Sequence, residues 1–284
     1  MLLAPRLRQL LVREQPDLIV SVLPVVNRVL AECVRPRALE VVLTDWQGVH
    51  RFWVAPGVQH YTAPTDLARL DCIRYGAPPA AVEVVGLPVR RAFLAASDPA
   101  ERRACLSALG LDPRRFTILT MVGAEGSPST LRNLAHLVRA PLDAQVLVIC
   151  GHNAGLRRRV EALPGRVPRR AVGFVENVAA LMRSSDLLVT KAGGMTLAEA
   201  FCSGIPVVVD DALPGQEAGN LAFVLKHQAV EYAPRPRQLA ETVLALRADA
   251  TRRTALAARA RRLARPDAAA RIATGLLERL RERG

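Results

Sequence analysis

The stretch Lys191–Asn220, KAGGMTLAEAFCSGIPVVVDDALPGQEAGN, decides the fold. The apolar run Asp186–Thr190 before it predicts a buried parallel strand, a glycine pair then opens a predicted helix, and a second strand is expected over Ile205–Val209. A strand that runs into glycines and a helix N-terminus offers backbone N–H groups and the positive end of the helix dipole to a phosphate. Polar side chains that suit sugar hydroxyls accompany it: Glu199, Gln216, Glu217 and Asn220. The stretch therefore predicts a parallel α/β sheet whose edge binds a nucleotide diphosphate sugar.

Short apolar, β-branched runs alternate with helical patterns along the rest of the chain. We expect strands at Asp17–Ser21, Leu39–Thr44, Gln59–Ala63, Val82–Val85, Phe116–Met121, Gln145–Cys150, Ala171–Phe174, Asp186–Thr190 and Ile205–Val209. This alternation predicts an α/β fold with parallel sheets covered by helices on both faces. Residues 1–96 hold only four of these strands and no glycine-rich first turn. We therefore expect an incomplete first domain over 1–96 and a complete doubly wound domain over 97–284, with the boundary near Ser97-Asp98-Pro99.

Composition limits the partners that the chain can have. The formal net charge is +13, and the 39 basic residues include only two lysines, Lys191 and Lys226. A charge of this size attracts polyanions. An anionic membrane surface and a solvated basic face both fit, whereas no motif indicates specific binding of nucleic acid. Five widely spaced cysteines predict reduced core thiols rather than a metal or redox site.

The chain shows no apolar run long enough to cross a membrane and no signal-peptide pattern. We therefore expect a cytoplasmic protein, either free or peripheral on the inner face of the membrane.

Six segments, in this order and spacing, resemble one family of enzymes. They are PDLIVS (16–21), TDWQGVHRFWVAPGVQHYTAPTD (44–66), VVGLPVR (84–90), GHN (151–153), GFVENVAALMRSSDLLVTKAGGMTLAEA (173–200) and LPGQEAGN (213–220). Together they resemble the monogalactosyldiacylglycerol synthases and processive diacylglycerol glucosyltransferases, which are related to the peptidoglycan enzyme that adds N-acetylglucosamine to lipid I. The resemblance implies a GT-B fold of two Rossmann-like domains. It also implies transfer of a hexose from a UDP-sugar to a lipid hydroxyl, with diacylglycerol favoured and with inversion. We expect no metal or other cofactor, since the helix dipole and backbone N–H groups can stabilise the leaving diphosphate.

The resemblance also assigns roles in binding the UDP-sugar. Phe174 and Val175 would border the nucleobase, and Glu199 would bind the ribose hydroxyls. Asn220 would support the loop that faces the donor sugar. The remaining matched residues are Gly193, Gly194, Met195 and Thr196 at the diphosphate, Gln216 and Glu217 at the donor sugar, and His152 and Asn153 in a polar loop at a strand end.

Several of these residues have a structural alternative. Thr196-Leu-Ala-Glu199 also fits a capping box, in which Glu199 would satisfy the start of its own helix. Gln216 and Glu217 suit the first turn of a helix, and Asn153 suits a turn. Gly123 and Gly126 follow a strand and fit either the site or a plain turn.

In the first domain, Asp45 and His50 follow a predicted strand, where open α/β sheets place ligands. His50 matches a family histidine that faces the acceptor and suits proton transfer near neutrality; a structural hydrogen bond is the alternative. The aromatic residues nearby fit core packing or a surface near a lipid acceptor: Trp46, Phe52, Trp53 and Tyr61.

The chain departs from the family at its start, because relatives carry a further section ahead of PDLIVS. Three explanations remain open: a longer natural protein, a partner polypeptide that supplies the missing half, or a nucleotide-sugar-binding chain without catalysis. A non-lipid aglycone is the alternative acceptor. Asp210-Asp211 is adjacent rather than spaced for a metal and predicts loop capping. The arginines over 252–283 lie in helices expected to return to the first domain, where they also suit anionic lipid headgroups.

Overall fold

The computed structural model describes residues 3–34, 38–122, 128–215 and 217–282. The chain forms two compact units, residues 1–89 with 265–284 and residues 90–264. The division lies earlier than the expected boundary at residue 96. Phe93 is fully buried, the Ser97 hydroxyl donates to the carbonyl of Arg183, and the Arg183 guanidinium donates to the carbonyl of Ala92. These contacts tie the segment after residue 89 to the second unit.

The first unit contains one parallel sheet of four strands. Its order is β1 (Leu18–Ser21), β2 (Ala38–Val42), β3 (His60–Ala63) and β4 (Val82–Val84). Its helices are α1 (Leu3–Glu14), α2 (Asn27–Cys33), α3 (Asp66–Arg74) and α12 (Ala268–Arg281), with short 3-10 turns η1 (Pro24–Val26), η2 (Arg51–Trp53) and η3 (Pro79–Ala81).

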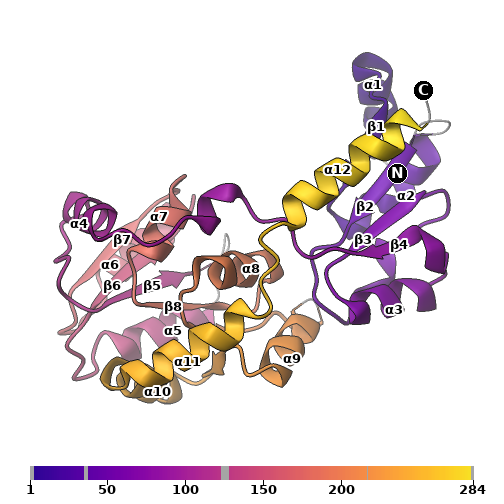
Figure 1. Cartoon of the computed structure of the whole chain (residues 1–284). Coiled ribbons are helices and arrows are strands. Elements are labelled where there is room, and N and C mark those ends of the chain that lie inside the picture. The colour runs from indigo at the N-terminus through magenta and orange to yellow at the C-terminus, as the bar shows by residue number, and fades with distance from the viewer. Residues whose placement is uncertain (1–2, 35–37, 123–127, 216, 283–284) are drawn as a thin grey trace. The chain divides into compact units, whose positions relative to one another are not determined.

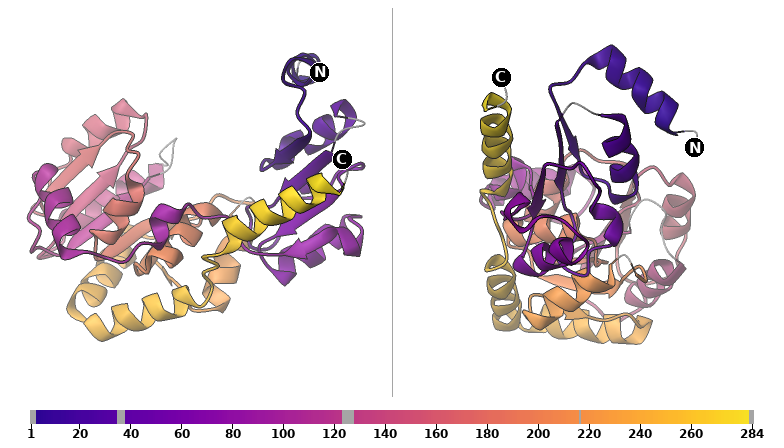
Figure 2. Two further views of the ribbon diagram at one scale, coloured as in Figure 1. Left: turned by 45° about the horizontal axis from the view of Figure 1, so that its top comes forward. Right: turned by 90° about the vertical axis from the view of Figure 1, so that its right-hand side faces the viewer.

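The two faces of this sheet carry different cores. Alternate residues of a strand point to opposite faces, so Leu39 and Val41 enter the larger core, which α1, α2 and α3 share. Val42 faces the other way, in a small cluster with Ala268 and Ile272 of α12. Figure 2 shows α12 lying along one face of the sheet and α2 and α3 on the other. The C-terminal helix is therefore the cover of one face of the first unit.

The second unit contains a parallel sheet of six strands (Figure 1). Its order is β10 (Glu231–Tyr232), β9 (Val207–Asp211), β8 (Leu187–Lys191), β5 (Thr117–Met121), β6 (Gln145–Ile149) and β7 (Arg169–Val172). Its helical elements are η4 (Arg91–Leu94), α4 (Pro99–Ala108), α5 (Pro128–Leu137), α6 (Ala154–Glu161), α7 (Val178–Arg183), α8 (Gly194–Ser203), α9 (Ala218–Lys226), α10 (Pro236–Ala248) and α11 (Ala250–Arg261). All nine expected strands are present, with bounds that differ by at most two residues.

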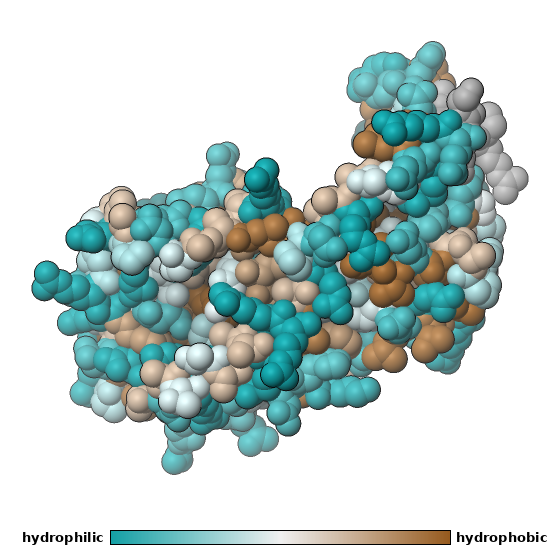
Figure 3. Space-filling view, in the orientation of Figure 1, coloured by the Kyte–Doolittle hydropathy of each residue, from teal (hydrophilic) through white to brown (hydrophobic). Residues whose placement is uncertain are grey.

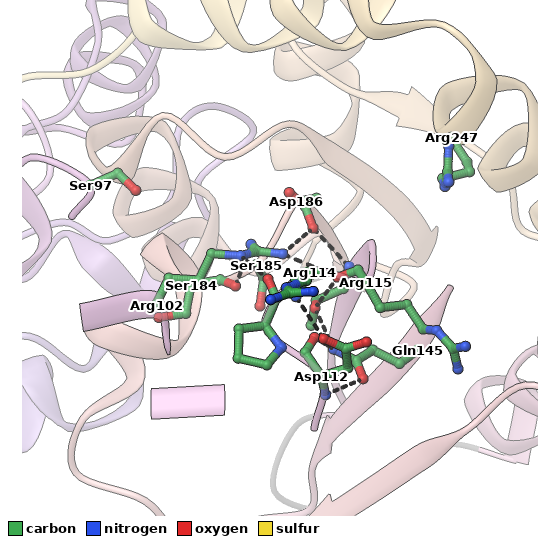
Figure 4. Close-up of polar contacts among 12 residues, drawn as sticks. Ser97, Arg102, Asp112, Arg114, Arg115, Gln145, Ser184, Ser185, Asp186 and Arg247 are labelled. Carbon is green, nitrogen blue, oxygen red and sulfur yellow. Dashed lines mark hydrogen bonds and ion pairs between the residues drawn. The ribbon is translucent and has the colours of Figure 1, made fainter. Parts of the chain in front are cut away.

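The amino-terminal edge of the second sheet is occupied by structural contacts (Figure 4). Arg102 of α4 donates to the carbonyls of Pro113, Arg115 and Ser184 and pairs with Asp186 at 2.9 Å. Asp186 also accepts from the backbone N–H of Thr117 at 2.7 Å. These bonds join the starts of β5 and β8.

The cysteines are free thiols, as expected. Burial raises the pKa of Cys72 to about 12 and that of Cys150 to about 11, which makes both unreactive near neutrality. Among the described residues, no helix has the length and apolar character needed to cross a membrane.

Candidate functional site

The carboxyl ends of the second sheet gather most of the residues expected to bind the donor. In chain order, β5 is followed by β6 and then β7 on one side of it, and β8 pairs with the opposite side of β5. The strand order therefore reverses between β5 and β8, and open α/β sheets bind ligands at such a point, beyond the carboxyl ends of the strands. Gly193 and the start of α8 follow β8 directly at this edge.

The start of α8 decides one of the open alternatives. Gly193 is the N-cap residue and brings no side chain to cap the helix, which begins at Gly194. Thr196 is therefore inside the first turn rather than at the N-cap, and Glu199 lies in the second turn. The capping-box interpretation of these two residues is wrong, because that motif requires Thr196 itself to be the N-cap.

Glu199 lies half-buried on α8. Burial raises the pKa of its carboxyl, and the charge of Arg90 opposes the shift. Within the described parts of the chain, no hydrogen bond to this carboxylate is recorded. A carboxylate with this surrounding can accept hydrogen bonds from two vicinal hydroxyls of a ligand.

Glu217 is held more firmly than the sequence suggested. Its side chain is 4% exposed, its Oε1 pairs with Nζ of Lys191, and its Oε2 accepts from the backbone N–H of Leu213 at 3.0 Å. It occupies the N-cap position of α9 but makes no cap bond to that helix. Gln216 lies outside the described residues, as do Gly123 and Gly126. Asn220 is buried in α9.

Lys191 is a polar residue of this edge that the sequence reasoning did not select. It ends β8, two residues before the N-cap of α8, and its side chain is 34% exposed. Its rarity was a usable signal, since lysine occurs at only one other position in a chain rich in arginine.

The two aspartates that end β9 have different surroundings. Asp211 accepts from the N–H of Ala212 at 2.8 Å and from the Ser129 hydroxyl at 2.6 Å, so the expected loop capping is confirmed for this residue. Asp210 is 3% exposed, and the side-chain amide of Asn133 donates to it at 3.3 Å. Burial raises the pKa of Asp210 to about 6.

The ends of β6 and β7 bring two aromatic rings together. His152 stacks on Phe174 with centroids 4.6 Å apart and an angle of 9° between the ring planes. Phe174 is 61% exposed, and Val175 beside it is half-buried. Asn153 is the N-cap of α6 and accepts from the N–H of Leu156 at 2.8 Å. This contact corresponds to the structural role in a turn that the sequence also allowed for Asn153. The exposed ring pair offers a flat apolar surface suited to a base.

The residues expected at the acceptor lie in the first unit. The carboxylate of Asp45 accepts from the indole N–H of Trp53 at 3.0 Å, and Nδ1 of His50 accepts from the N–H of Phe52 at 3.2 Å. Of the four aromatic residues near them, Trp46, Trp53 and Tyr61 are buried, whereas Phe52 is 48% exposed. Core packing therefore explains three of the four.

No cluster of three or more His, Cys, Asp or Glu side chains that could hold a metal ion occurs in the described ranges of the chain.

Two family models match the chain in sequence. The model of monogalactosyldiacylglycerol (MGDG) synthase matches residues 1–89, and that of glycosyl transferases group 1 matches residues 120–263. The chain is 31% identical to the chloroplastic monogalactosyldiacylglycerol synthase of Spinacia oleracea over 96% of its own length and 55% of that protein. It is also 31% identical to the processive diacylglycerol beta-glucosyltransferase of Bacillus licheniformis, over 86% of its own length and 64% of that protein. The chain thus spans between about half and two thirds of the length of these relatives.

Solved structures agree on the fold. Anabaena HepE in complex with UDP and glucose superposes with a TM-score of 0.68 at 16% identity, over 97% of this chain and 81% of that one. MurG of Acinetobacter baumannii superposes with a TM-score of 0.67 at 16% identity, over 95% and 76%. The expected GT-B architecture, with two Rossmann-like parallel sheets, is confirmed.

Proposed function

The chain belongs to the glycosyl transferases of group 1, and from this premise we propose that it transfers a hexose from a UDP-sugar to a lipid hydroxyl, with inversion. Diacylglycerol is the favoured acceptor, since relatives that are 31% identical over the matched residues are named for diacylglycerol glycolipids.

One observation carries the donor half of this proposal. The exposed Phe174–His152 stack and the start of α8 lie at the same carboxyl edge of one parallel sheet. A flat apolar surface suits the base, and a helix N-terminus suits the diphosphate. The ribose links the base to the diphosphate, and the half-buried carboxylate of Glu199 suits its hydroxyls.

The remaining residues of the donor site take the roles that the family resemblance gives them. Gly193 to Thr196 hold the diphosphate, Gln216 and Glu217 face the hexose, and Asn220 supports their loop from within α9. The partial positive charge at the start of α8 stabilises the leaving diphosphate, so no metal is needed for this step.

In the transfer itself, the acceptor oxygen forms a bond to the anomeric carbon while the bond from that carbon to the diphosphate oxygen breaks. The proton of the acceptor hydroxyl passes to His50, and UDP leaves with the electron pair. Asp45 accepts a hydrogen bond from the indole N–H of Trp53 and so holds this buried ring in place within the first unit.

The first unit has a surface that suits a lipid acceptor. Of the fifteen exposed large apolar side chains among the described residues, eleven belong to this unit. Leu67 and Leu70 lie on α3, over which Figure 3 shows apolar residues gathered among hydrophilic ones. With a net charge of +13, the protein would contact the anionic inner face of the membrane as a peripheral enzyme.

A second candidate is a UDP-sugar-binding chain that requires a further polypeptide segment for turnover. The observation in its favour is the outer edge of β1, which pairs only with β2 among the described strands. Val20 on this strand and Val22 just after it are 42% and 57% exposed. An exposed apolar edge of this kind is unfavourable in a protein that is soluble on its own.

Three experiments test these candidates. Calorimetric titration with UDP tests the donor site, and the absence of binding would refute both candidates. Incubation with UDP-glucose or UDP-galactose and diacylglycerol vesicles then tests transfer; binding without product would favour the second candidate. Flotation with anionic and neutral vesicles tests the membrane contact, and no flotation with either would favour a non-lipid acceptor.

A further inference from the structure

Lys191 and Glu217 form an ion pair between the end of β8 and the start of α9. The family resemblance gives no role to Lys191 and places Glu217 at the donor sugar. In the structure both carboxylate oxygens of Glu217 are already engaged, one by the lysine ammonium and the other by the N–H of Leu213. The pair therefore joins the end of β8 to the N-cap of α9 and, through Glu217, to Leu213.

The burial of Glu217 means that its carboxylate needs the charge of Lys191 as a partner. The side chain of Glu217 is 4% exposed, whereas that of Lys191 is 34% exposed. A buried carboxylate without a partner is strongly unfavourable, and removing one member of a buried pair leaves that cost uncompensated. Among the described residues, Lys191 is the cation that pairs with this carboxylate.

The pair also lies against the proposed anion site. A β-carbon placed on Gly193 would lie 3.6 Å from Oε1 of Glu217 and 3.9 Å from Oγ1 of Thr196. A diphosphate at the start of α8 would therefore bind close to a carboxylate. Two like charges at such a separation repel each other unless a cation neutralises one of them.

We propose that Lys191 is a positioning residue of the donor site that acts through Glu217. Its ammonium neutralises the Glu217 carboxylate beside the start of α8, so that an anionic diphosphate can bind there, and it holds in place the side chain that accepts from the N–H of Leu213. The inference rests on the proposed function, because it assumes that this edge binds a nucleoside diphosphate.

The test is calorimetric titration of the whole chain with UDP and with uridine, which lacks the phosphates. K191M should weaken UDP binding by about 10- to 100-fold, the range of one or two charge-assisted hydrogen bonds, and leave the binding of uridine unchanged.

Adding E217Q to K191M should restore UDP affinity to within about threefold of the original chain, since no negative charge then remains to be neutralised. E217Q alone should tighten UDP binding, because it leaves the lysine charge in excess. K226M is the matched control, since it removes the other lysine, which is exposed at the far end of α9.

Each result bears on the inference. Unchanged UDP affinity in K191M, or failure of E217Q to restore it, would overturn the indirect role through Glu217. If K191M does not fold, E217Q alone still decides, because weaker UDP binding in that variant contradicts the proposed repulsion. If the original chain does not bind UDP, the proposed function fails and this inference fails with it.

Discussion

Arg279, in the last turn of α12, donates from Nε and Nη2 to the two carboxylate oxygens of Glu40 on β2, at 2.9 and 2.7 Å. The side chain of Glu40 is only 2% exposed and that of Arg279 is 24% exposed. Glu40 points to the face that α12 covers, whereas its neighbours Leu39 and Val41 point into the opposite core. Two residues 239 positions apart thus attach the C-terminal helix to the first unit.

Removing the arginine should destabilise the first unit. R279A leaves the buried Glu40 carboxylate without its cation, and breaking a buried pair in this way costs about 3–5 kcal/mol of unfolding free energy. R279K should recover only part of this loss, because an ammonium cannot make the two parallel bonds of a guanidinium. Urea unfolding followed by circular dichroism measures both variants.

The control is R281A, which removes an exposed arginine two residues further along the same helix. The double variant E40M/R279M should cost less than R279A alone, because it leaves no unpaired charge. Equal destabilisation by R279A and R281A would contradict the structural role of the pair.

Glu199 should matter for the nucleotide and not for the helix. Since α8 begins at Gly194, E199A removes no cap, and because burial raises the pKa of this carboxyl, its loss should leave stability at pH 7 unchanged or improved. UDP binding should weaken by about 10- to 100-fold through the lost bonds to the ribose. Calorimetry with UDP and a thermal melt measure the two effects.

The discriminating ligand is 2′-deoxy-UDP, which lacks one of the two ribose hydroxyls. The loss caused by E199A should be smaller with this ligand than with UDP. The exposed Glu278 of α12 supplies the control variant E278A. An E199A chain that binds UDP normally would remove Glu199 from the ribose site.

The sequence predicted the sheets well because their signal is local. Runs such as Gln145–Ile149 are apolar and β-branched over their whole length, since a parallel sheet buries both faces of its strands. The alternation of these runs with helical patterns predicts parallel sheets, whereas the order of strands around β5 is known only from the structure.

The contacts of the polar side chains could not be predicted in this way. Whether Thr196 lies before or within a helix depends on where that helix begins, and a shift of three residues separates a cap from a ligand-binding turn. The pairing of Lys191 with Glu217, or of Arg279 with Glu40, joins elements distant in sequence. Such pairs are set by packing, and single-sequence patterns carry no record of them.

Asp210 should make stability depend on pH. Burial raises its pKa to about 6 from an ordinary value of 3.8, so the folded chain favours the protonated form. Its cost to stability is absent below the ordinary value, grows as the pH rises towards about 6, and is complete above that, at about 3 kcal/mol. D210N should therefore raise the unfolding free energy at pH 7.5 and have little effect at pH 4.

Denaturant unfolding at the two pH values, for the variant and the original chain, gives the comparison. D17N, at an exposed aspartate before β1, is the control for loss of one negative charge. A gain from D210N that is equal at both pH values would show that the effect is not the titration of Asp210.

His50 can be tested by a substitution that separates its two roles. Its Nδ1 accepts from the N–H of Phe52, which caps η2 and puts the proton of the neutral ring on Nε2. To take a proton from the acceptor, the ring must first release that bond, at a cost of about 1 kcal/mol.

Asparagine is a good N-cap residue but no proton acceptor, so H50N should keep the melting temperature and UDP affinity. If His50 is the base, H50N should lose about 100-fold or more in turnover with UDP-sugar and diacylglycerol. H50A, which loses both roles, should also melt earlier. Normal turnover in H50N together with impaired turnover in H50A would assign His50 to the cap alone.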